Sequence, residues 1–157
     1  KINPSYIIYD HLSTLGRLDY FTHYGVPILF SVYLYFASVT PNSGTIQILI
    51  VSLSVFTALL FNMLILIYNL SRSKSDFRLP DLQARIVREV YSNISYSIFI
   101  SLLSILFLVI ISFSVESSVK SALSSIIYFL LSNFFLTILM SLKRAHVLLS
   151  ERFENNV

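Results

Sequence analysis

Polar side chains recur at helical spacing inside the most apolar parts of this chain. These residues are Asn62, Asn93, Ser97, Ser101, Ser104, Asn133 and Thr137. The four between positions 93 and 104 share one helix face because they are three or four residues apart, and so do positions 133 and 137. At such positions, carboxamides and hydroxyls either form hydrogen bonds between packed membrane helices or line a water-filled pore. The spacing leaves both interpretations open, helix packing and pore lining.

Three of these residues lie at a similar depth in their segments. Asn62, Ser97 and Asn133 are roughly 9–14 Å from the same end of the segments that contain them, at 1.5 Å per residue. Neighbouring membrane helices would bring them to one level. We therefore expect Asn62, Ser97 and Asn133 to form a polar layer.

The residue types that are missing from these segments exclude several classes of function. The apolar segments contain no Asp, Glu, Lys or Arg, and the whole chain has no Cys and only 3 Gly. Proton relays use carboxylates or His within the membrane, and zinc sites need three or four convergent ligands. His11, His23 and His146 are single residues at segment edges, and we expect His23 at the membrane interface. The sequence therefore predicts a non-enzymatic protein with no metal and no other cofactor.

Four apolar runs must position these residues. The chain has 157 residues, 55% hydrophobic and 12% charged, with a mean hydropathy of +0.76, which is far from a soluble domain. The expected spans are 20–38, 46–70, 91–114 and 122–142. Pro27 in the first run is tolerated in membranes and is expected to kink the helix. We predict an all-α integral membrane protein with four transmembrane helices, forming a single domain over 1–157.

The distribution of basic residues predicts the orientation. Of the 11 Lys and Arg residues, only Lys120 lies in a link between the first two or the last two spans. Cytoplasmic loops are enriched in Lys and Arg. We therefore expect both termini in the cytoplasm, with 1–19, 71–90 and 143–157 as the cytoplasmic segments.

The cytoplasmic segments carry helical patterns of their own. Pro80 suits a first helical position, and Leu82, Ile86 and Val90 recur every four residues after it. We expect the third span to begin near Pro80 as an amphipathic cytoplasmic helix, and the fourth span to project beyond the membrane.

Basic residues at these membrane edges could contact lipid or protein. They are Arg78, Arg85, Arg88, Lys143 and Arg144. Anionic lipid alone would explain them, but acidic residues are interleaved with them, which favours a docking surface for a soluble protein. A net charge of +3 is too small to indicate direct nucleic-acid binding.

The layout resembles a known class of proteins. The segment "HLSTLGRLDYF" before a Pro-containing span and the entry "REVYSNISYSIFISLL" to the third span are similar to small four-span membrane proteins of bacterial antiphage systems, such as the membrane component of Kiwa. The resemblance covers architecture and transfers no functional residue. It implies a bacterial inner membrane, a homo-oligomer, and either sensing of phage damage or permeabilisation of the membrane.

Two functions follow as hypotheses. The first is a non-enzymatic oligomer that couples the bacterial inner membrane to a cytosolic partner, as a membrane sensor or anchor in antiphage defence. The alternative is a pore-forming effector or small channel whose path is lined by Asn62, Ser97 and Asn133.

Overall fold

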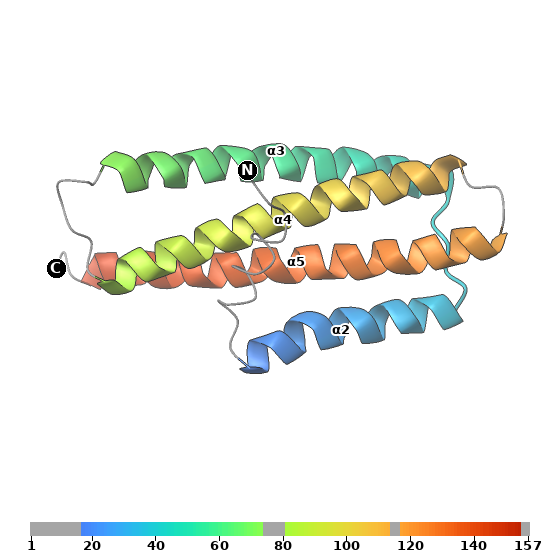
Figure 1. The fold of residues 1–157 in the computed structure, drawn as a ribbon, viewed down its shortest axis with the longest axis horizontal. Coiled ribbons are helices and arrows are strands. Elements are labelled where there is room, and N and C mark those ends of the chain that lie inside the picture. The colour runs from blue at the N-terminus through green and yellow to red at the C-terminus, as the bar shows by residue number, and fades with distance from the viewer. Residues whose placement is uncertain (1–16, 74–80, 114–116, 155–157) are drawn as a thin grey trace, which may run out of the picture.

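The computed structural model describes residues 17–73, 81–113 and 117–154, and this part of the chain forms four α-helices. The helices are α2 (Arg17–Phe36), α3 (Ser43–Ser73), α4 (Asp81–Phe113) and α5 (Ser117–Glu154). Figure 1 shows them along one long axis, with successive helices running in opposite directions. α4 and α5 pack together at the centre, α3 packs on α4, and α2 packs on α5. The predicted all-helical fold is confirmed.

Three of the helices are long and apolar enough to cross a membrane. Their apolar stretches are Ser43–Asn69, Val87–Phe113 and Ser118–Lys143. These stretches contain nearly all of the second, third and fourth spans expected from the sequence. The structure is therefore that of a membrane protein with three candidate transmembrane helices.

The helix at the expected first span, 20–38, is shorter than the others. α2 has 20 residues with Pro27 inside it, and it does not meet the hydropathy of a span within the described residues. Arg17, Asp19 and several tyrosines lower its hydropathy. A fourth span is not shown, although α2 packs along α5.

The link between α2 and α3 is a tight, capped turn. Ser38 adopts a positive φ of 52° just beyond α2, and the N–H of Val39 donates to the carbonyl of Leu34 at 3.2 Å. This is the usual way for a helix end to satisfy its last carbonyls. Asn42 then caps α3, since its Oδ1 accepts from the N–H of Thr45 at 2.7 Å. These caps allow the chain to reverse within a few residues.

Both central helices are longer than a bilayer requires. α4 begins at Asp81, directly after Pro80, and α5 continues to Glu154. Their 33 and 38 residues correspond to about 50 Å and about 57 Å of helix, whereas a hydrocarbon core is about 30 Å thick. The predicted helical extensions of the third and fourth segments are therefore present.

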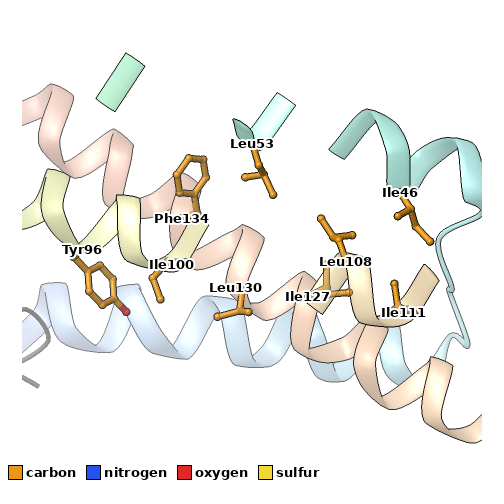
Figure 2. Close-up of a cluster of buried hydrophobic side chains, with 9 residues drawn as sticks. All are labelled: Ile46, Leu53, Tyr96, Ile100, Leu108, Ile111, Ile127, Leu130 and Phe134. Carbon is orange, nitrogen blue, oxygen red and sulfur yellow. The ribbon is translucent and has the colours of Figure 1, made fainter. Parts of the chain in front are cut away.

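The burial pattern is that of a molecule surrounded by apolar solvent. As many polar as apolar side chains are buried among the described residues, while large apolar side chains cover the outside of α2 and α3. Figure 2 shows the main apolar cluster, which includes Leu108 and Ile111 of α4, Ile127 and Phe134 of α5, and Leu53 of α3. Because lipid is as apolar as these side chains, the helices are held together by close packing and interhelical hydrogen bonds.

A pair of serines joins α2 to α5. Ser31 Oγ donates to the carbonyl of Ser125 at 2.7 Å, and the two hydroxyl oxygens lie 2.8 Å apart. Because Ser31 is buried at this contact, the pair fixes the register of the two antiparallel helices.

The serine pair can be tested by cross-linking, because the chain has no Cys. We expect Ser31→Cys with Ser125→Cys to form an intramolecular disulfide under mild oxidation, since side chains in contact place their Cβ atoms within disulfide range. Protection from a maleimide-polymer gel shift measures the yield. Ser31→Cys with Phe56→Cys, whose second residue is exposed on α3, is the control. Equal protection in both variants would contradict this packing.

Candidate functional site

A proline within α2 frees a backbone carbonyl at the contact with α5. Pro27 has no N–H, so the carbonyl of His23, four residues earlier, lacks its usual helical partner. Asn133 of α5 supplies a replacement, because its Nδ2 donates to this carbonyl at 3.4 Å. All three residues are buried. Asn133 therefore allows α2 to continue as one helix through Pro27 at a buried position.

The side chain of His23 is bound to the same face of α5. His23 is only 2% exposed, and its Nε2 lies 3.2 Å from Thr137 Oγ1. The hydroxyl of Thr137 also donates to the carbonyl of Asn133 at 2.9 Å. The hydroxyl of Thr137 thus lies between the ring of His23 and the carbonyl of Asn133.

α4 reaches the same place through a tyrosine. The ring of Tyr96 is buried and lies 6.3 Å from the ring of His23, centre to centre. Tyr24 packs edge-on against His23 at 5.1 Å, and the side chains of Tyr24 and Tyr96 are hydrogen-bonded. Three helices thus meet at one polar cluster. We call it the polar junction; its residues are His23, Tyr24, Tyr96, Asn133 and Thr137.

The polar junction holds α2 against α5 through the contacts of His23 and Asn133, and Tyr96 of α4 packs near the ring of His23. Asn133 Oδ1 is buried without a hydrogen-bond partner among the described residues, which leaves an acceptor beside His23. No group of three or more His, Cys, Asp or Glu that could hold a metal ion occurs in the described part of the chain.

The polar face predicted on α4 lies inside the molecule. Asn93, Ser97, Ser101 and Ser104 are all fully buried or nearly so. Ser101 Oγ is 2.7 Å from Thr57 Oγ1 of α3, whereas the hydroxyls of Ser97 and Ser104 donate to carbonyls of α4 itself. These contacts lie within one chain, and they fit the packing interpretation of this face.

Asn62 does not join this face, so the expected layer with Ser97 and Asn133 is wrong for Asn62. Asn62 is exposed, whereas Thr57 is buried against α4. The two residues are five positions apart on α3, so their side chains point about 140° apart around the helix. The depth of a residue gives its position along the helix axis, whereas the rotation of the helix about that axis decides which neighbour its side chain faces.

His23 is the residue that the sequence analysis missed. The expectation of an interfacial His23 is corrected by its burial between α2 and α5. One signal in the sequence could have found it: a buried proline leaves the carbonyl four residues earlier without a donor. Nothing in the sequence, however, identifies Asn133 as the side chain that supplies the donor.

The structure describes the side chains of two of the five basic residues expected to contact lipid or a partner. Arg88 and Lys143 are exposed. Arg78 lies outside the described residues, and the side chains of Arg85 and Arg144 are not described, although both belong to helices.

No family model, curated protein or solved structure matches this chain.

The bond between Asn133 and the freed carbonyl gives a sharp prediction. Asn133→Leu should lower the free energy of unfolding by about 0.6–1.7 kcal/mol, the scale of an interhelical hydrogen bond in a membrane protein. In a Pro27→Ala background the loss should be smaller, because the introduced alanine supplies its own N–H to the carbonyl of His23. Equilibrium unfolding in mixed micelles measures both.

Thr57→Val is the matched control for this cycle. It removes a buried interhelical hydroxyl on the far side of α4, so its cost should be the same with and without the Pro27→Ala substitution, because the sites share no partner. Equal costs of Asn133→Leu in the two backgrounds would refute the proposed role of Asn133.

Proposed function

We propose that this chain is a non-enzymatic, oligomeric protein of the bacterial inner membrane that couples the membrane to a cytosolic protein partner. We propose further that it acts as a sensor or anchor in antiphage defence. The single observation that carries the proposal is the continuity of α4 and α5 beyond their apolar stretches at one end of the molecule.

That continuity is visible in the helix bounds. α4 begins six residues before its apolar stretch Val87–Phe113, and α5 continues eleven residues after its stretch Ser118–Lys143. Figure 1 shows the start of α4 and the end of α5 at the same end of the molecule. The projecting segments, 81–86 and 144–154, carry both acidic and basic residues. Mixed charge suits a protein partner, since anionic lipid needs no carboxylates on the protein.

The proposed topology places this end in the cytoplasm, with α2 as the fourth membrane helix. Support comes from the basic residues near the end of α3, the start of α4 and the end of α5, which lie toward this end, whereas Lys120 lies near the start of α5 at the opposite end. A helix of 20 residues is about 30 Å long and can span a hydrocarbon core. The polar junction supports the placement of α2, because its polar groups are paired with α5 rather than exposed to lipid.

The same helix joins the polar junction to the projecting end. Asn133 and Thr137 lie on α5, which continues without interruption past Lys143 to Glu154. A displacement of α2 that breaks the contacts of His23 would act on α5 close to the membrane edge. The proposed coupling therefore runs from the α2–α5 contact along α5 to the partner.

The defence role rests on the resemblance of the layout to small four-span membrane proteins of antiphage systems.

The proposed topology predicts opposite accessibility for two introduced cysteines. Val119→Cys at the start of α5 and Lys143→Cys near its membrane edge are both at exposed positions of a chain without Cys. In intact spheroplasts a membrane-impermeant maleimide should label Val119→Cys, and it should label Lys143→Cys only after permeabilisation. Labelling of Lys143→Cys alone in intact spheroplasts would reverse the topology.

The partner surface is tested by charge reversal on α4. Arg85→Glu with Arg88→Glu should abolish capture of the cytosolic partner, because the positive charge near the start of α4 is inverted. Proteins co-purified from cells by the wild type and the variant are compared by mass spectrometry. Lys120→Glu, at the opposite end, should leave capture unchanged. The same soluble proteins captured by all three would count against this surface.

A further inference from the structure

The outward face of α3 is the least covered apolar surface of the candidate spans. Only 11% of the apolar stretch of α3 is buried, compared with 50% for α4 and 33% for α5. α3 packs on α4 through Leu53, Thr57, Leu60 and Leu64. The opposite face carries no other helix of the described chain.

Asn62 stands on that outward face. It lies about 10 Å inside the apolar stretch, measured from Asn69 at 1.5 Å per residue. The other two carboxamides at comparable depth, Asn93 and Asn133, are buried between helices, but Asn62 is exposed. A carboxamide in hydrocarbon without a hydrogen-bond partner is strongly unfavourable, so its surroundings in a membrane must supply both a donor and an acceptor.

A second copy of the same chain supplies both. A carboxamide has an N–H₂ donor and a carbonyl acceptor, so two Asn62 side chains facing each other across a symmetry axis satisfy one another. Acyl chains offer neither group. We infer that the face of α3 around Asn62 is the surface on which two copies of this chain associate, with Asn62 hydrogen-bonded to Asn62 of the second copy.

The residues next to Asn62 permit a close approach of two helices. Ser54 and Ala58 are exposed and lie eight and four residues before Asn62, so the three share one side of α3 within about 80°. Small residues four apart let membrane helices come near enough for side chains to bond across the contact. Ser54 Oγ is bonded to the carbonyl of Ile50 in its own helix, so Asn62 is the residue that needs the partner.

This inference rests on the oligomeric part of the proposed function and names the surface that forms the oligomer. It is independent of the cytosolic partner, whose proposed surface is the projecting end of α4 and α5. The two proposals can therefore fail separately.

Single cysteines on α3 test the contact, because the chain has none of its own. Ser54→Cys and Ala58→Cys should each give a disulfide-linked dimer when the protein is oxidised in phosphatidylethanolamine–phosphatidylglycerol liposomes. Phe56→Cys is the matched control: this position is also exposed and lies at nearly the same depth, but it points about 160° away from Ser54 and Ala58 and about 120° away from Asn62 around the helix. It should give no dimer above the level of random collision.

The role of Asn62 is measured in the Ser54→Cys background. Asn62→Leu should weaken association on the order of tenfold, as followed by dimer yield against the protein-to-lipid ratio. Asn62→Gln, which keeps the carboxamide, should retain most of the association. A leucine on a lipid-exposed face is compatible with the membrane, so Asn62→Leu should leave the folded monomer intact. A loss of dimer in this variant therefore reflects loss of the contact between copies.

Three outcomes would overturn the inference. Equal dimer yields from Phe56→Cys and Ser54→Cys, or unchanged association with Asn62→Leu, would remove this face as the interface while leaving an oligomer possible through another surface. If cross-linking in native membranes gives a product whose mass differs from that of two copies of this chain, the face binds a different protein. Monomers under all conditions would refute the oligomeric part of the proposed function as well, without touching the charge-reversal result.

Discussion

A backbone carbonyl that loses its helical donor at a buried position is shielded from water, so another part of the protein must provide a donor. Pro27 creates such a carbonyl on His23, and Asn133 of α5 donates to it. The position of α2 follows from this requirement, because only one face of α5 presents Asn133 together with Thr137. The imidazole of His23 then bonds to Thr137, and the serine pair Ser31–Ser125 extends the contact in the antiparallel direction. The α2–α5 interface is thus organised around the consequence of one proline.

The same constraint explains where the other polar residues lie. Side chains that can bond to a carbonyl of their own helix, such as Ser97 and Ser104, remain buried in close packing without needing a partner on another helix. Thr57 and Ser101 use their contact to align α3 with α4. These polar side chains face the interior of one chain. A water-filled path would therefore have to form between two or more copies of the protein.

The long central helices connect these interior contacts to the surface. α4 and α5 share the core around Leu108, Ile127 and Phe134, and each continues unbroken beyond its apolar stretch. In the proposed coupling, this packed pair of helices moves as a body over short distances and transmits a change at the polar junction to the charged end. α3, held by one face only, leaves its other face for association. The proposed partner surface and the proposed self-association surface therefore occupy separate regions.

The amino-acid sequence by itself determined the helices and their chemistry. Long apolar runs define the three candidate spans, Pro80 precedes the start of α4, and the spacing from Asn93 to Ser104 defines one face of a helix, because these are properties of a single helix and its solvent. The direction of Asn62, the burial of His23 and the pairing of α2 with α5 were decided only by the tertiary structure. The physical reason is that periodicity gives the relative angles of residues on one helix, whereas the neighbour that each face meets depends on the packing of all the helices together.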